Sequence, residues 1–250
     1  MSGDDRPDLA PLARIAQEVA AEWGVELGEP FALARYSYVA PAGEDAVLKV
    51  TPPEDDESDE EAEALELWAG DGAARLLRRD RARRALLVER ARPGTDLAGL
   101  PEDDATRIAV EVGLRLWRPA GAPFRWIGDW VPRWLEGRPG GLTPLARELY
   151  SSLDVGRETL VHGDFHHQNI LARGDGWAAI DPKPMLGERE YDVASFLWNP
   201  LPCRLRLEHL EARLTAFSAA GLDEERIRIW TLIRGAYLQP QDSALLRALV

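Results

Sequence analysis

The stretch Leu160-Val-His-Gly-Asp-Phe-His-His-Gln-Asn-Ile-Leu171 contains three of the four histidines of the chain. Ala178-Ala-Ile-Asp181 follows it closely. Both segments include short apolar runs that are typical of strands, and Gly174-Asp175-Gly176 between them is typical of a hairpin loop. A histidine cluster by itself fits a hydrogen-bonded loop equally well, but polar side chains at the open end of a hairpin indicate a site.

The hairpin geometry predicts which polar side chains meet. If the hairpin is symmetric about Asp175, Asn169 faces Asp181, and facing residues lie about 5 Å apart. An amide oxygen beside a carboxylate suits a hard cation such as Mg²⁺, which binds substrate phosphates at such sites. Asp164 lies in the preceding loop, where its carboxylate is suited to orient or deprotonate a hydroxyl.

The His-x-Asp-x4-Asn spacing that begins at His162, with Asp181 downstream, is the spacing of the protein-kinase catalytic loop. Such enzymes also need an upstream strand lysine that holds phosphates and pairs with a helix glutamate. Lys49 lies in the strand-like run Ala46-Val-Leu-Lys-Val50, and it is one of only two lysines among 30 Lys and Arg residues. An arginine fork is not equivalent to a compact ammonium at such a position.

These motifs resemble those of the aminoglycoside phosphotransferase and choline-kinase-like family, which has the protein-kinase-like fold. The segment His162 to Leu171 is similar to the family signature His-Gly-Asp-x-His-x-x-Asn. Ile180-Asp-Pro-Lys-Pro-Met-Leu-Gly-Glu-Arg-Glu-Tyr-Asp-Val-Ala194 more narrowly resembles the streptomycin and hydroxyurea phosphotransferase branch. The resemblance extends over about residues 30–200.

The resemblance implies roles for the residues of the catalytic loop and its surroundings. Asp164 is expected to be the catalytic aspartate, with Asn169 and Asp181 as the Mg²⁺ ligands. Asp192 is similar to the buried aspartate that braces the catalytic loop in this family, which is a structural role.

The resemblance also implies an ATP site. Lys49 is expected to hold the ATP phosphates and to take part in catalysis. Its glutamate partner is expected to be Glu61, with Glu63 as the second choice, although either one also fits a solvated acidic face. The hinge that meets adenine through backbone groups is expected to contain Val88, Glu89 and Ala91.

The segment before Lys49 departs from the protein-kinase pattern. No Gly-x-Gly-x-x-Gly lies between Phe31 and Lys49, and Arg35-Tyr-Ser-Tyr38 occupies the expected turn. Because antibiotic kinases of this family generally lack the full glycine pattern, the departure weakens a protein-kinase assignment more than the family resemblance. Ser37 is expected either to contact phosphate or to be a surface turn serine.

The order of predicted elements indicates an α+β fold with two lobes. Residues 1–91 are expected to form a small, strand-rich nucleotide-binding lobe, and residues 92–250 a larger helical lobe for catalysis and acceptor binding. Strands are predicted at 31–39, 46–50, 85–88, 159–161 and across 170–180. Helices are predicted at 9–23, before 70, and at 101–117, 129 onward, 142–153, 191–198, 204–220, 223–237 and 243–249.

Composition bounds the class of protein. A chain of 250 residues with 45% hydrophobic content can bury a core, and one cysteine excludes an internal disulfide. The sequence has neither a secretory signal nor a run of about 20 apolar residues, so we expect a cytoplasmic protein without membrane association. The formal net charge of −13 argues against nucleic acid as a partner.

Side chains beyond the signature are candidates for acceptor binding. Lys183 follows the metal aspartate and is expected to contact phosphate or acceptor, or to pair with Glu188 or Glu190. Glu188 and Glu190 are themselves candidates to face a cationic acceptor. Helix packing is the favoured explanation for the cluster of Trp117, Trp126, Trp130 and Trp134, and an aromatic wall beside the acceptor is the alternative.

The sequence therefore predicts an enzyme that uses ATP and Mg²⁺ to phosphorylate a hydroxyl of a small molecule. A streptomycin-like aminoglycoside or a related antibiotic is the expected acceptor, and a sugar or an amino alcohol is the alternative. Two remote alternatives are a non-catalytic nucleotide-binding protein and a metallo-hydrolase with Asp164, His166 and His167 as metal ligands. The protein is expected to be a monomer or a weak dimer.

Overall fold

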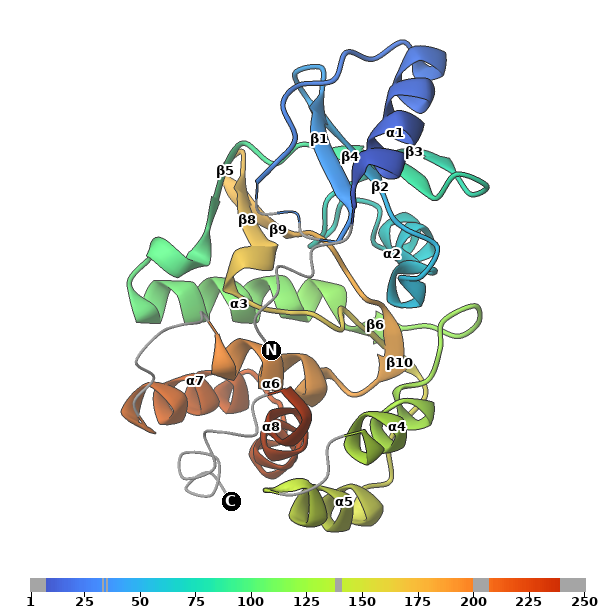
Figure 1. Cartoon of the computed structure of the whole chain (residues 1–250). Helices are drawn as coiled ribbons and strands as arrows, with labels where there is room; N and C mark the ends of the chain where they lie inside the picture. The colour runs from blue at the N-terminus through green and yellow to red at the C-terminus, as the bar shows by residue number, and fades with distance from the viewer. Residues whose placement is uncertain (1–7, 33, 35, 138–140, 200–206, 239–250) are drawn as a thin grey trace. The chain divides into compact units, whose positions relative to one another are not determined.

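The computed structural model describes residues 8–32, 34, 36–137, 141–199 and 207–238 (Figure 1). The chain divides into two compact units, the first ending at Gly94 and the second beginning at Thr95. The segment Ala172–Ala178 groups with the first unit, whereas the sequence placed everything after residue 91 in the second.

The first unit is built on a four-stranded antiparallel sheet with strand order β1-β2-β4-β3. Ala40, Leu48 and Val50 are buried on this sheet because alternate strand positions point to one face. Its strands are β1 (Tyr38–Ala42), β2 (Ala46–Val50), β3 (Leu76–Asp80) and β4 (Ala85–Glu89).

Two helices accompany this sheet, α1 (Ala10–Trp23) and α2 (Glu61–Trp68). The α1 helix packs its apolar stripe into the same buried cluster as Leu48. It begins at Ala10, one residue after the predicted start, and ends at Trp23 as predicted. The Asp8 carboxylate accepts a hydrogen bond from the backbone N–H of Ala10, and Gly24 ends the helix with a φ of 69°.

The sequence did not predict strand β3. It lies inside a basic stretch, and Leu77, Arg78 and Arg79 along it are exposed. The strand is at the edge of the sheet, and edge strands that carry charged side chains lack the alternating apolar pattern on which prediction depends.

The second unit is mainly helical. Helix α6 is buried along nearly its whole length and packs against α8. Its helices are α3 (Glu102–Leu116), α4 (Val131–Glu136), α5 (Thr143–Ser152), α6 (Arg189–Trp198), α7 (Leu207–Ala219) and α8 (Glu224–Leu238). These positions agree with the prediction, except that the helix expected at 243–249 and residues 204–206 lie outside the described residues.

A small sheet with the order β10-β7-β6 completes the second unit. Strand β7 leads directly into the histidine-rich loop. Its strands are β6 (Arg118–Pro119), β7 (Thr159–Val161) and β10 (Met185–Gly187). Single-turn 3₁₀ helices occur at Asp56–Ser58, Leu97–Gly99, Ile127–Asp129 and His167–Asn169.

The predicted hairpin after this loop is present, in a sheet of order β5-β8-β9. Its strands are β5 (Pro93–Asp96), β8 (Ile170–Arg173) and β9 (Gly176–Ala179).

The predicted register of the hairpin is wrong by one residue. The loop contains two residues, Gly174 and Asp175, where three were expected. The backbone N–H of Ile180 donates to the carbonyl of Asn169, at 2.9 Å, so Asn169 pairs with Ile180 and Asp181 is the next residue along. Gly174 makes the tight loop possible because its φ is +61°.

Among the residues that the structure describes, no helix is long and apolar enough to cross a membrane.

Candidate active site

His162 begins the loop that follows β7, and its ring is fully buried. Nε2 lies 3.0 Å from the carbonyl oxygen of Ile180, and Nδ1 accepts a hydrogen bond from the backbone N–H of Asp164 at 3.3 Å. Because Nδ1 accepts, the ring is neutral and Nε2 carries the proton that it donates to Ile180. Burial lowers the pKa of His162, which favours the same neutral form.

Asp192 of α6 fixes the start of this loop. One carboxylate oxygen accepts the backbone N–H of His162 at 2.7 Å and the indole N–H of Trp117 at 2.8 Å. The other accepts the backbone N–H of Gly163 at 2.8 Å. Burial raises the pKa of Asp192, and these three donors act in the opposite direction. The bracing contact expected from the resemblance is therefore present.

Asp164 is held by contacts on both carboxylate oxygens, and its side chain is 28% exposed. The Asn169 amide donates to its backbone carbonyl at 2.9 Å and to Oδ2 at 3.2 Å. His166 Nε2 lies 3.5 Å from Oδ2, and Arg234 Nη2 lies 3.7 Å from Oδ1.

These contacts favour the ionised form of Asp164. Burial by itself would raise the pKa of the carboxyl, but the hydrogen bond from His166 and the charge of Arg234 outweigh it. The pKa therefore lies well below its ordinary value, and Asp164 is ionised at neutral pH. An ionised carboxylate in a partly open loop can accept a hydrogen bond from a substrate hydroxyl.

Asp181 follows the hairpin in an unusual backbone conformation. Its φ of 57° lies in the left-handed region, which non-glycine residues rarely adopt, and its side chain is exposed. Such strain is frequent at functional sites. Because Asp181 is the residue after Ile180, which pairs with Asn169, the hairpin brings an amide and a carboxylate to the same end.

This donor set fits a Mg²⁺ ion that takes one or two protein ligands and completes its shell with water and substrate phosphates. Within the described residues no group of three or more His, Cys, Asp or Glu side chains is arranged to hold a metal. His167, a ligand in the metallo-hydrolase alternative, is instead stacked on Phe196 with ring centroids 4.0 Å apart. These contacts do not support that alternative.

Lys49 and Glu61 form a buried ion pair in the first unit. Lys49 Nζ lies 2.6 Å from Glu61 Oε2, with side chains 8% and 3% exposed. Lys49 comes from β2 and Glu61 opens α2. Glu63 instead contacts Arg79 at 2.9 Å and Arg81 at 3.3 Å. Of the two glutamates considered from the sequence, the structure pairs Glu61 with Lys49.

The residues expected around the adenine and phosphates lie at or next to the ends of strands β1 and β4. Ser37 is buried just before β1, Val88 and Glu89 end β4, and Ala91 follows. The Glu89 carboxylate accepts from the backbone N–H of Arg75 and from Arg173, both at 3.2 Å. That side chain is therefore part of the internal bonding of the unit, and contacts between these residues and a nucleotide stay a prediction.

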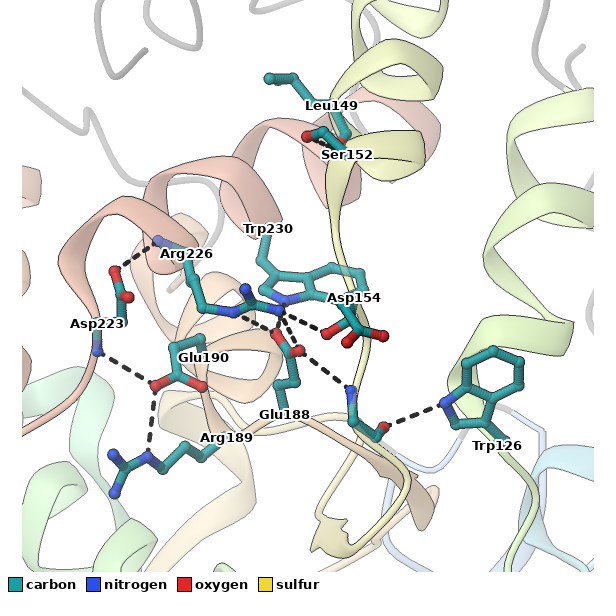
Figure 2. Close-up of polar contacts among 11 residues, drawn as sticks. Trp126, Leu149, Ser152, Asp154, Glu188, Arg189, Glu190, Asp223, Arg226 and Trp230 are labelled. Carbon is teal, nitrogen blue, oxygen red and sulfur yellow. Dashed lines mark hydrogen bonds and ion pairs between the residues drawn. The ribbon is translucent and has the colours of Figure 1, made fainter.

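Glu188 lies at the centre of a polar network in the second unit. Figure 2 shows its carboxylate between Arg226 and Trp230. Arg226 Nε donates to it at 2.9 Å, Trp230 Nε1 at 2.9 Å and the backbone N–H of Gly156 at 3.2 Å. Glu190 accepts from the backbone N–H of Asp223 at 3.2 Å (Figure 2). Acceptor binding by these two glutamates stays a prediction, and these contacts do not support it.

Lys183 contacts the loop through its backbone. Its N–H donates to the carbonyl of His162 at 2.8 Å. A side chain at Gly163 would meet the Lys183 carbonyl oxygen at 1.9 Å, and Gly163 has a φ of +83°. The signature glycine is therefore required by close backbone approach. A substrate contact by the Lys183 side chain stays a prediction.

The sequence missed Arg234, which lies 71 residues after Gly163 in the buried second half of α8. No motif surrounds it, so no local signal could have identified it. Two of the clustered tryptophans make structural hydrogen bonds, Trp117 with Asp192 and Trp126 with Gly156. Trp130 and Trp134 pack against each other with centroids 6.3 Å apart, as helix packing predicts.

The architecture is that of solved kinases of small molecules. The choline kinase LicA from Streptococcus pneumoniae matches with a TM-score of 0.64 at 12% identity, covering 95% of this chain and 96% of that chain. An aminoglycoside-3'-phosphotransferase of type VIII matches with a TM-score of 0.65 at 19% identity, covering 91% of this chain and 100% of that chain. The chain therefore has the predicted α+β, protein-kinase-like fold.

Sequence comparison narrows the class. Residues 32–239 match the family described as aminoglycoside/hydroxyurea antibiotic resistance kinase, and the chain belongs to this family. It is 36% identical to a streptomycin 3''-kinase of Klebsiella pneumoniae, covering 75% of this chain and 76% of the relative. It is 33% identical to a hydroxyurea phosphotransferase of Kitasatospora aureofaciens, covering 87% of this chain and 69% of the relative. The protein is thus a phosphotransferase, as predicted.

The two glutamates of α2 give a matched test of the buried pair. Replacing Glu61 with Gln takes the carboxylate from a buried ammonium, so the free energy of unfolding should fall by about 3–5 kcal/mol. Glu63→Gln removes a more exposed ion pair with Arg79, so the free energy of unfolding should fall by at most about 1 kcal/mol. Denaturant titration of both variants measures the difference. Equal losses for the two variants would contradict a special role of the Lys49–Glu61 pair.

Proposed function

We propose that the protein transfers the γ-phosphoryl group of ATP to a hydroxyl of a streptomycin-like aminoglycoside. The observation that carries the proposal is the position of the Asp164 carboxylate, which accepts a hydrogen bond from the Asn169 amide in a loop with the family signature. The lowered pKa of Asp164 supports it. Relatives named as streptomycin 3''-kinase and streptomycin 6-kinase support this acceptor.

In the proposed reaction, Asp164 accepts a hydrogen bond from the acceptor hydroxyl and takes its proton as the oxygen attacks. The new O–P bond forms as the bond between the γ-phosphorus and the bridging oxygen breaks, and ADP leaves with the electron pair. There is little covalent chemistry for the protein to perform, so the rate comes from positioning and charge stabilisation.

The proposal also assigns a role to each residue that is expected to bind the nucleotide. Lys49, oriented by Glu61, neutralises phosphate charge, and Ser37 contacts a phosphate. Mg²⁺, held by Asn169 and Asp181, supplies electrostatic stabilisation of the phosphates when bound. The adenine meets the hinge that contains Val88, Glu89 and Ala91.

Other acceptors follow from the same chemistry. Hydroxyurea is named for one relative, and sugars and amino alcohols carry comparable hydroxyls. The proposal includes a cytoplasmic location, where ATP is available, and a monomer or weak dimer without a nucleic-acid partner. The net charge of −13 supports the last point because it repels a polyanion.

The role of Asp164 is tested by Asp164→Asn, which keeps the shape of the side chain and removes its charge. We expect kcat to fall by about 10²–10⁴-fold, the usual contribution of a general base. Asp175→Asn in the exposed hairpin turn is the matched control and should leave kcat unchanged. A coupled assay of ADP release measures both. Full activity of folded Asp164→Asn would refute the assignment.

The acceptor is tested by measuring ADP release with a panel of hydroxyl compounds. We expect streptomycin to give the highest kcat/KM among streptomycin, other aminoglycosides, hydroxyurea, sugars and amino alcohols. Mass spectrometry of the product should then show addition of one phosphoryl group. Efficient turnover of a sugar or an amino alcohol with none of streptomycin would favour the alternative acceptor class.

A further inference from the structure

Arg234 of α8 is a buried cation beside the proposed catalytic aspartate. The residue is 6% exposed. Its Nη2 donates to the carbonyl of Gly163 at 3.0 Å and lies 3.7 Å from Asp164 Oδ1. Nε and Nη1 are buried and have no hydrogen-bond partner among the residues that the structure describes. Its contacts with polar groups are therefore concentrated on the loop that carries Asp164.

The Tyr191 ring packs against the guanidinium. Its central carbon lies 4.6 Å from the centroid of the Tyr191 ring, which is the geometry of a cation–π contact. The Tyr191 hydroxyl is 3.3 Å from the Tyr237 hydroxyl, and Tyr237 is one turn after Arg234 on the same helix. These contacts restrict the positions that the guanidinium of Arg234 can adopt.

A second buried arginine shows how a structural cation is satisfied in this fold. Arg213 of α7 is 1% exposed, and its guanidinium contacts the Glu102 carboxylate. It also donates to backbone carbonyls of Phe196, Leu197 and Asn199. Arg213 is thus paired and bonded on several sides, as a buried cation requires.

Within the described part of the chain, Arg234 has fewer hydrogen-bond partners than Arg213. Leaving buried N–H groups without partners is costly, and an apolar side chain of similar volume would fill the same space at lower cost. Packing alone therefore does not account for an arginine at this position. The two polar groups that it does reach belong to consecutive residues, Gly163 and Asp164, at the proposed reaction centre.

We propose that Arg234 is a positioning residue for phosphoryl transfer, which fixes the Gly163–Asp164 segment and places a positive charge beside the Asp164 carboxylate. The proposal rests on the function proposed above. An incoming phosphoryl group brings negative charge toward a carboxylate, and the charge of a buried, fixed cation beside it offsets the repulsion. The effect belongs to the chemical step rather than to nucleotide binding.

The test compares Arg234→Met and Arg234→Lys with Arg213→Met and Arg213→Lys. Because misplacing a reacting group by about 1 Å can cost 10²-fold, we expect Arg234→Met to lower kcat by about 100-fold with an unchanged KM for ATP. Arg234→Lys keeps the charge and should restore part of kcat. The Arg213 variants should lower the melting temperature while leaving kcat of the folded protein unchanged. If Arg234→Met does not fold, the two lysine variants give the comparison.

Hydrogen exchange of the peptide that covers residues 159–169 provides a readout that does not require turnover. Arg234→Met should exchange faster in this peptide than the wild type, and the Arg213 variants should not. If the wild type phosphorylates no acceptor, the proposed function fails, and the exchange data alone decide the role of Arg234. The proposal would be overturned if Arg234→Met kept the wild-type kcat, or if the Arg234 and Arg213 variants lost kcat to the same extent. If the wild type is inactive, equal exchange rates of the wild type and Arg234→Met in this peptide would overturn it.

Discussion

The carboxylate of Asp192 is the group on which the geometry of the site depends. It is fully buried and receives the backbone N–H groups of His162 and Gly163 together with the indole N–H of Trp117. Strand β7 ends at Val161, and the sheet hydrogen bonds end with it. The bonds to Asp192 instead satisfy the backbone N–H groups at the start of the loop. The position of Asp164 follows from them, because it is the next residue.

The opposite side of the loop is fixed by backbone contacts. Gly163 lies so close to the Lys183 carbonyl that no side chain fits, and His162 bonds to Ile180 through its ring. The hairpin end that carries Asp181 is thereby tied to the loop that carries Asp164. One continuous segment therefore carries the ionised Asp164 and also Asn169 and Asp181, whose amide and carboxylate suit a hard cation. This explains why a short motif can specify so much of the site.

The sequence predicted the parts of the site whose chemistry is local. Motifs predicted the spacing from His162 to Asn169 and the pairing of Lys49 with a helix glutamate, because the chemistry at each of these positions requires a particular residue type. The hairpin register was missed by one residue, since a Gly-Asp-Gly loop permits either two or three loop residues. Strand β3 was missed because an exposed edge lacks the apolar alternation that predicts strands.

Long-range contacts set the limit of prediction. Glu188 is a candidate to face a cationic acceptor, and the sequence does not reveal that Arg226 and Trp230 on α8 donate hydrogen bonds to its carboxylate (Figure 2). Arg234, on the same helix, reaches Asp164 from the far end of the chain. Helical periodicity predicts that α8 forms a helix, but it does not predict that Arg234 on this helix contacts the loop that carries Asp164.

The measurement that tests this account most directly is the rate of phosphoryl transfer by Asp192→Asn. Its amide nitrogen cannot accept the N–H groups that the carboxylate receives, so the loop should lose its fixed start. We predict that kcat falls by at least about tenfold while the folded variant still binds ATP, since misplacement of reacting groups lowers the rate of the chemical step. A folded Asp192→Asn enzyme with wild-type kcat would contradict the claim that this carboxylate positions the catalytic loop.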